Sequence, residues 1–237
     1  QKFFRPSISL ESSYGKTKGT FEPSEGSNVM KHWFGGAHPS QTNSTEILKG
    51  REQSLERTVR IAQKLYSGKP LTIKNAWNCF RIPYLSEAFP DSKFIWARRD
   101  IYQSAVSDLK ARYVTKGTPS KWNSATPANI EELLTLPPHE QVIENQYEFN
   151  QAISKDFLDL PSDRTLSVWY EDLIENSKLE ISRISEFLSM MPNNESINLS
   201  PSIKSEIEIS ENTLNKMKEF LKMHPRFVPY FHKEEAF

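Results

Sequence analysis

Hydrophobic and polar positions follow different patterns before and after residue 51. Residues 1–50 are polar and hold six of the eight glycines together with three prolines, so we expect loops and short elements there, grouped around Trp33-Phe34. From Glu52 onward, apolar residues recur every three or four positions, which is the spacing of an amphipathic helix. The regular part of the fold is therefore predicted to begin at Glu52.

After residue 51 the pattern alternates between helical spacing and short apolar runs. Short strands that alternate with longer helices indicate an α/β fold around a parallel sheet, in which ligands bind beyond the carboxyl ends of the strands. Lys74, Arg99 and Tyr170 fall at such ends, and Gly68 is predicted to end the first helix. The predicted strands are 71–75, 93–97 and 165–170, and the predicted helices are 52–67, 79–88, 101–113, 138–157, 179–188 and 214–221.

Charge and cysteine content exclude several classes of protein. The 30 basic and 30 acidic side chains give no net charge, which argues against binding of nucleic acid or of an anionic membrane surface. Cys79 is the only cysteine, so an intramolecular disulfide and a cysteine-rich zinc site are excluded, and the scattered histidines suggest no metal site. No segment has the length of a membrane span and no targeting segment is visible, which favours the cytoplasm.

The segment from Arg99 to Ser107 carries the strongest chemical signal. A strand brings Arg99 to the carboxyl edge of the sheet and a helix begins at once, so backbone N–H groups and a bidentate guanidinium can together hold a phosphate. Ser107, two helical turns further on, can add a hydroxyl donor. The residues alone leave a second interpretation open, in which Arg99 pairs with Asp100 or another carboxylate and Ser107 only packs.

Four segments between residues 71 and 189 form a recognisable series. They are Lys74-Asn75 with Asn78 and Arg81-Ile82-Pro83; Phe89 to Ile95 with Arg99-Asp100 and Ser107; Trp122 with Pro127, Leu136-Pro137 and Glu140-Gln141; and Tyr170-Glu171-Asp172-Leu173 followed by Ile181, Ile184, Phe187 and Leu188. This series resembles the P-loop sulfotransferases, bacterial type, which use 3′-phosphoadenosine 5′-phosphosulfate (PAPS). The resemblance implies a three-layer α/β fold, with a central parallel sheet flanked by helices, as a single domain over residues 1–237 with an acceptor-side helical insert at 111–157.

For the nucleotide, the resemblance implies that PAPS is the sulfonyl donor, that 3′-phosphoadenosine 5′-phosphate (PAP) is the product, and that no metal is needed. Arg99 and Ser107 match the positions that bind the 3′-phosphate. Tyr170 matches a position near the adenine, although a buried aromatic that covers the end of the third strand is the slightly favoured alternative. Lys74 matches a strand-end lysine that stabilises negative charge on the leaving nucleotide, and a solvated lysine is the alternative.

On the acceptor side, the resemblance implies transfer to a hydroxyl or an amine of a small molecule, a sugar or a lipid. Arg81 matches a contact to the acceptor or to a phosphate, whereas a helix-surface arginine without such a role is the common alternative. Asn78 stands where some relatives have histidine, and its amide would orient the acceptor because it cannot take a proton. Trp33 and Trp122 suit a sugar face or a ring. The general base is expected among three residues near the N-terminus, namely Glu22, Glu25 and His32, the glutamates being exposed loop carboxylates in the alternative interpretation.

One part of the family pattern has no match in the sequence. Sulfotransferases bind the 5′-phosphosulfate with a strand, a loop containing glycine and Ser or Thr, and a helix. Gly15-Lys16-Thr17 lacks both a preceding apolar strand and the glycine spacing of a P-loop. We therefore expect the strand and loop to lie upstream of Gln1, and we keep a non-catalytic nucleotide-binding or interaction module of the same fold as the alternative function.

Overall fold

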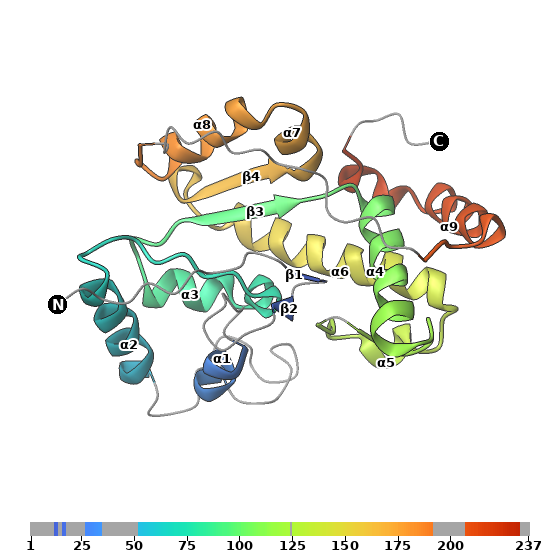
Figure 1. Cartoon of the computed structure of the whole chain (residues 1–237), viewed down its shortest axis with the longest axis horizontal. Coiled ribbons are helices and arrows are strands. Elements are labelled where there is room, and N and C mark those ends of the chain that lie inside the picture. The colour runs from blue at the N-terminus through green and yellow to red at the C-terminus, as the bar shows by residue number, and fades with distance from the viewer. Residues whose placement is uncertain are drawn as a thin grey trace. The chain divides into compact units, whose positions relative to one another are not determined.

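The chain divides into two compact units, unit 1 at residues 1–84 and unit 2 at residues 85–237. The structure is a computed structural model that describes residues 12–13, 16–17, 27–34, 52–123, 125–191 and 207–232 (Figure 1). Each unit is described by itself. Among these residues, no helix combines the length and the apolar character that crossing a bilayer requires.

Unit 1 consists of short elements and one longer helix. Strands β1 (Ser12–Ser13) and β2 (Lys16–Thr17) pair antiparallel, and the helices are α1 (Ser27–Phe34), α2 (Glu52–Leu65), the 3-10 helix η1 (Ala76–Phe80) and the start of α3 (Ile82–Ala88). Helix α2 ends as the sequence predicts, because Gly68 takes a positive φ of 76° and its N–H donates to the Gln63 carbonyl at 2.8 Å. Met30, Trp33, Phe34 and Leu55 are buried.

The predicted strand at 71–75 is wrong. Residues 69–75 have no regular secondary structure, and Leu71 and Ile73 are exposed. At the end of this stretch the Asn75 side chain accepts a hydrogen bond from the Trp77 backbone N–H at 3.0 Å and so caps η1. The predicted helix over 79–88 is likewise replaced by η1 and α3, which are separated at Arg81.

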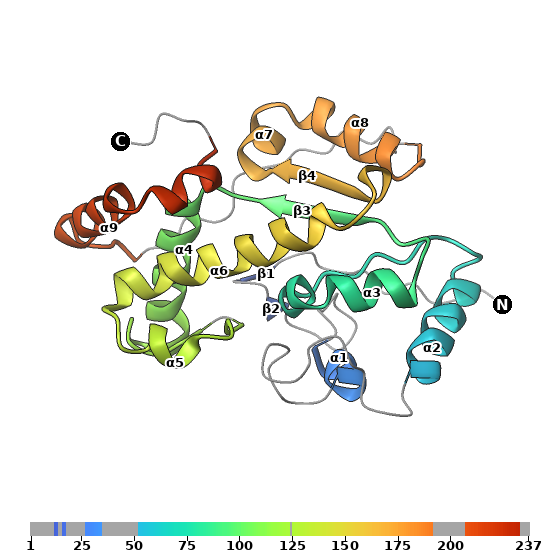
Figure 2. The ribbon, with the colours of Figure 1, turned by 180° about the vertical axis from the view of Figure 1, so that it is seen from behind.

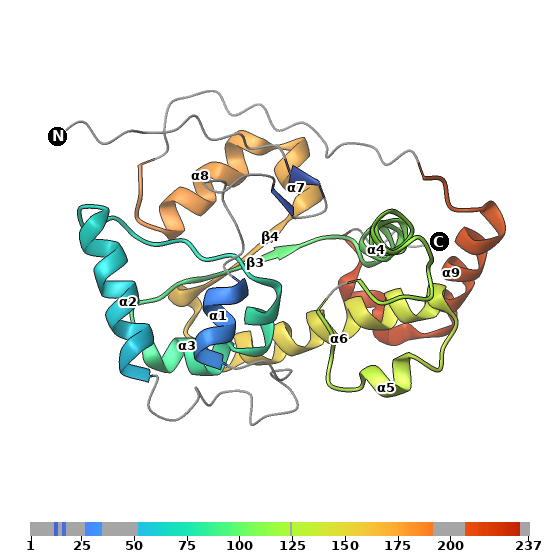
Figure 3. The same ribbon diagram turned by 60° about the horizontal axis from the view of Figure 1, so that its bottom comes forward.

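Unit 2 contains a parallel strand pair covered by helices on both faces. Strands β3 (Phe94–Arg98) and β4 (Thr165–Trp169) pair in the register that sets Arg98 opposite Trp169. Helices α7 (Tyr170–Glu175) and α8 (Ser177–Phe187) lie on one side of the pair (Figure 3). On the other side, Phe157 of α6 (Pro138–Leu158) packs edge-on against Trp96, with ring centroids 5.8 Å apart. The α/β class and its helix–sheet–helix layering are thus confirmed.

The core of unit 2 lies where three helices meet beside this pair. Helix α4 (Ile101–Lys116) packs on α6 and on α9 (Glu211–Met223), and the 3-10 helix η3 (Pro225–Tyr230) follows α9 (Figure 2). The short elements α5 (Ile130–Leu133) and η2 (Ser162–Arg164) complete the unit. The buried cluster consists of Ile101, Ala105, Leu109, Val142, Ile143, Met217, Leu221 and Phe227.

One part of the family-like series has a structural role that the sequence did not reveal. The Arg164 guanidinium, just before β4, donates to the Ser92 carbonyl at 3.0 Å and to the Phe89 carbonyl at 3.2 Å. These bonds hold the turn at 89–92, which leads into β3. The Phe89 to Ile95 segment therefore sets where β3 begins relative to β4.

Candidate functional site

The candidate site lies at the carboxyl end of the strand pair in unit 2. Strand β3 ends at Arg98, and α4 begins at Ile101, so Arg99 and Asp100 form the turn between them. Asp100 caps the helix, because its Oδ1 atom accepts the Gln103 backbone N–H at 3.0 Å. Arg99 thus follows a strand and precedes a helix N-terminus, as the sequence predicts.

Arg99 has a guanidinium group without an acidic partner in the part of the chain that the structure describes. Its Cζ atom lies 5.0 Å from the centre of the Tyr170 ring, and its Nε atom is buried without a hydrogen-bond partner. The alternative ion pair with Asp100 is not formed, because Asp100 instead accepts the backbone N–H groups of Gln103 and His232. The structure therefore brings Arg99 and Tyr170 together and leaves the guanidinium able to bind an anion.

Ser107 lies on α4, half-buried, and its hydroxyl makes no hydrogen bond with the residues that the structure describes. The helical rise of about 1.5 Å per residue sets Ser107 about 9 Å further along the helix axis than Ile101. Its predicted contact with the same phosphate as Arg99 stays a prediction. Tyr170 is the first residue of α7 rather than the last of β4, so the predicted third strand is one residue too long.

Arg98 stands next to Arg99 but has a different environment, which the sequence analysis missed. Its guanidinium lies between two indole rings, 4.4 Å from the centre of Trp96 and 4.0 Å from that of Trp169. It donates to the Pro229 carbonyl at 2.8 Å, and burial lowers its pKa. Arg98 is therefore held by two rings and a carbonyl, whereas Arg99 contacts one ring, and in both residues the Nε atom is buried without a partner among the described residues.

Two acidic residues that follow β4 were also missed as site residues. Glu171 accepts the Asp100 backbone N–H through Oε1 at 3.1 Å, and its Oε2 atom is buried without a partner among the described residues. Asp172 lies 2.7 Å from Nε2 of His232, and the His232 backbone N–H donates to Asp100 at 3.3 Å. The available signal was the position of Glu171 and Asp172, which follow a predicted strand directly.

The predicted residues Lys74, Asn78 and Arg81 belong to unit 1. Lys74 is exposed in the irregular stretch before η1, so its expected place at the end of a strand is wrong. Arg81 donates to the Asn78 side chain at 3.3 Å and lies 4.2 Å from the centre of the Phe34 ring. Arg81 is only 5% exposed, and burial lowers its pKa to about 10, so it is not an arginine of the helix surface.

The aromatic residues that were predicted to contact the acceptor are mostly covered by other parts of the protein. Trp33 is 5% exposed, and its indole Nε1 is buried with no hydrogen-bond partner in the described ranges, while His32 beside it is exposed. In unit 2, the Trp122 ring lies 4.5 Å from the Arg112 guanidinium, and its Nε1 donates to the Ala125 carbonyl at 3.1 Å. The candidate bases Glu22 and Glu25 lie outside the described residues.

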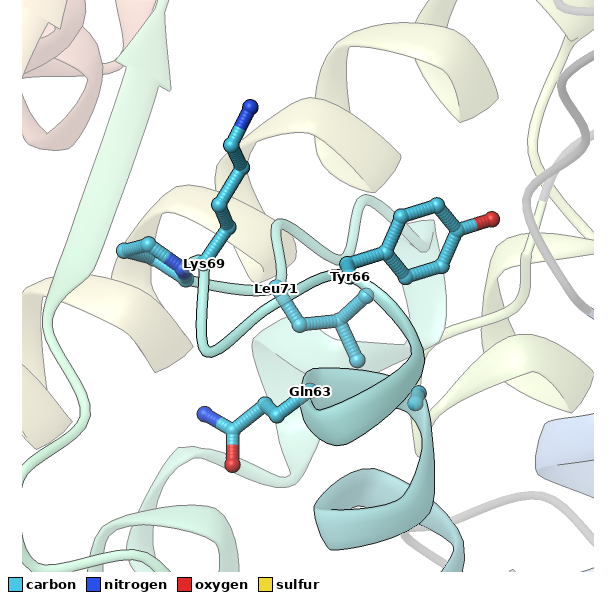
Figure 4. A pocket seen from close by; sticks show the side chains of 6 residues that line it. Gln63, Tyr66, Lys69 and Leu71 are labelled. Atoms are coloured by element: carbon cyan, nitrogen blue, oxygen red, sulfur yellow. The ribbon is translucent and has the colours of Figure 1, made fainter. Parts of the chain in front are cut away.

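A small pocket in unit 1 contains none of the predicted site residues. It has a volume of about 200 Å³ and is lined by Ala62, Gln63, Tyr66, Lys69, Pro70 and Leu71 at the end of α2 (Figure 4). Ligand pockets usually have about 300–1,000 Å³, so this hollow is too small for a nucleotide. Within the described residues no three His, Cys, Asp or Glu side chains are grouped to hold a metal ion.

Comparison with known proteins finds a family model that matches most of the chain. The family model described as "Sulfotransferase family" matches residues 13–191. No curated protein matches the chain. Among solved structures, a sulfotransferase domain from the curacin biosynthetic pathway is similar, with 14% identity, 80% of each chain covered and a TM-score of 0.47.

Proposed function

Because the chain belongs to the sulfotransferase family, we propose that it moves a sulfonyl group from PAPS to a hydroxyl or amine of a small-molecule, sugar or lipid acceptor. The observation that carries the proposal is the environment of Arg99. This guanidinium stands between a strand end and a helix N-terminus, contacts a tyrosine ring, and has a buried Nε without a partner among the described residues. A phosphate would supply the paired acceptors that such a group binds best.

The residues around this turn fit the 3′-phosphoadenosine part of the donor. Arg99 would bind the 3′-phosphate through parallel N–H donors, and Ser107 would add its hydroxyl from α4. Tyr170, stacked on Arg99, would lie beside the adenine and limit the rotation of the guanidinium. Asp100 and Glu171 accept backbone N–H groups, and neither carboxylate forms an ion pair with Arg99 in the described structure.

The transfer itself requires two further roles from the chain. PAPS supplies an activated sulfonyl group whose S–O bond to the nucleotide breaks as the acceptor forms its own bond to sulfur. Lys74 is proposed to stabilise the negative charge that develops on the nucleotide oxygen. Glu22, Glu25 or His32 is proposed to take the proton of the acceptor.

Asn78 and Trp122 are proposed to contact the acceptor. Asn78 cannot take a proton but can hold a hydroxyl, and its bond with Arg81 already fixes the orientation of its amide. Trp122, in the insert at 111–157, is proposed to offer the edge of its ring, because Arg112 covers one face.

A nucleotide-binding module without transfer activity is the second candidate. It is favoured by the conformation of Lys16–Thr17, which form β2 of a two-stranded antiparallel pair instead of a phosphate loop between a strand and a helix. Incubation with PAPS distinguishes the two functions, since only the enzyme would form PAP in an acceptor-dependent way. PAP binding alone would support the module.

Calorimetric titration with PAP tests the nucleotide site. The wild-type chain should bind PAP, and Arg99→Ala should weaken binding about 10- to 100-fold, because charge-assisted hydrogen bonds are lost. Arg60→Ala is the matched control, since it removes the same charge from an exposed position on α2. Absence of binding by the wild type would contradict the proposed function, and unchanged affinity in Arg99→Ala would contradict the site.

A further inference from the structure

The C-terminal segment, defined as residues 225–232, contacts the chain on both sides of Arg99. It comprises η3 and the two residues after it, and it lies beyond residues 13–191, which the family model matches. In Figure 1 its ribbon reaches the point where β3 passes into α4. The contacts that it makes there are specific and polar.

The first contact involves Arg98, the residue before Arg99. The Pro229 carbonyl accepts a hydrogen bond from the Arg98 guanidinium at 2.8 Å, and two indole rings enclose that guanidinium. This bond joins residues 131 positions apart. It fixes the last residue of β3 against the C-terminal segment.

The second contact involves Asp100, the residue after Arg99. The His232 backbone N–H donates to Oδ2 of Asp100 at 3.3 Å, while Oδ1 of Asp100 caps α4. The His232 ring is itself held, because its Nε2 lies 2.7 Å from Oδ1 of Asp172, and a carboxylate can only accept. The ring also packs against Trp169, with centroids 5.2 Å apart.

These contacts surround a residue that has little support of its own. Arg99 contacts the Tyr170 ring. Trp169, which precedes Tyr170, packs against the His232 ring of the C-terminal segment. Glu171, which follows Tyr170, accepts the Asp100 N–H. The backbone of Arg99 is thus held through its sequence neighbours Arg98 and Asp100. A guanidinium that is already held in one orientation loses less entropy when it binds a phosphate bidentately.

We propose that His232 is a positioning residue for the 3′-phosphate site, which acts on Arg99 through Asp172 and Asp100. This inference rests on the proposed function, because it presumes that Arg99 binds a 3′-phosphate. The His232 side chain anchors the C-terminal segment to α7, and its backbone N–H then holds the carboxylate that caps α4. Phe227 and Pro229 still hold the first part of the segment. Without the ring, its end at residues 231–232 loses its anchor to α7, and the bond from the His232 N–H to Asp100 beside Arg99 becomes less well ordered.

The test is a double-mutant cycle in the full chain, with PAP as the probe. His232→Ala should weaken PAP binding about fivefold in the wild-type background and by less than about twofold in the Arg99→Ala background. His232→Gln should stay within about twofold of wild type, because its amide can still donate to Asp172. His139→Ala, on the first turn of α6, is the matched control and should leave the affinity unchanged.

The outcomes separate a positioning role from a general loss of structure. Equal losses for His232→Ala in both backgrounds would overturn the proposal, because the effect would then not pass through Arg99. No loss in the wild-type background, or a loss in His232→Gln as large as in His232→Ala, would overturn it as well. If the wild type itself binds no PAP, the proposed function fails and this inference fails with it; if Arg99→Ala weakens binding and His232→Ala does not, only the inference fails.

Discussion

Arg98 and Arg99 are neighbours in the sequence but have different surroundings, and we expect them to have different roles. Arg98 lies between two indole rings and donates to a carbonyl, so its contacts are all within the protein. Arg99 stacks on one tyrosine ring and makes no hydrogen bond or ion pair with the described residues. The first arrangement stabilises the fold, and the second is suited to binding a ligand.

Substitution of the two arginines should therefore separate stability from binding. Arg98→Ala should lower the free energy of unfolding by about 2 kcal/mol, because two cation–π contacts and a charged hydrogen bond are lost. Arg99→Ala should lower it by less, about 0.5–1 kcal/mol, because only one cation–π contact is lost. Urea denaturation measures both values, and an equal destabilisation by the two variants would contradict the assignment.

At the scale of elements, the spacing of apolar residues predicted helices and strands correctly where the element packs against the rest of its unit. The buried positions Ala105 and Leu109 of α4 follow the predicted helical spacing, and β3 and β4 were found to within one or two residues. The stretch at 71–75 has the composition of a strand but has no strand partner among the described residues. Strand formation depends on pairing, which composition does not encode.

The missed elements and site residues depend on contacts between distant segments. Helix α7 has only six residues and no side-chain cap, so the spacing of apolar residues does not predict it. The roles of Glu171 and His232 come from bonds that span 71 and 132 positions respectively, ending on Asp100. The position of Arg99 could be predicted because it depends only on a local order, a strand followed at once by a helix.

Helix α6 carries a carboxylate that should make stability depend on pH. Burial raises the pKa of Asp156 from 3.8 to about 6, with Lys155 lowering it and Asp159 raising it. The folded protein thus binds this proton more tightly than the unfolded chain, so its contribution to stability is full below pH 4 and is lost as the pH rises through about 6.

Asp156→Asn should remove this dependence. At pH 7 the variant should be more stable than wild type by about 1 kcal/mol, a value reduced for solvent screening of a half-buried group. At about pH 3, below the unfolded-state pKa of 3.8, the difference should become small, because the wild-type carboxyl is then largely protonated in both states. Denaturant unfolding at the two pH values measures the effect; Asp163→Asn, at an exposed position, is the control, and a stability difference independent of pH would contradict the explanation.

On the scale of the whole molecule, an anion must be held by local charge. The 30 basic and 30 acidic side chains cancel, so no long-range field draws in a nucleotide. The proposed nucleotide binding would then depend on Arg99 and on the segments that order it. Residues beyond the family match also complete the fold, because Met217, Leu221 and Phe227 join the buried cluster on α4 and α6.

The most direct test compares the affinities of the chain for PAP and for adenosine 5′-phosphate, which lacks only the 3′-phosphate, in the wild type and in Arg99→Ala. The wild type should prefer PAP by about tenfold or more, and the preference should fall close to unity in the variant. A preference of the same size in both proteins, or none in the wild type, would contradict a 3′-phosphate site at Arg99.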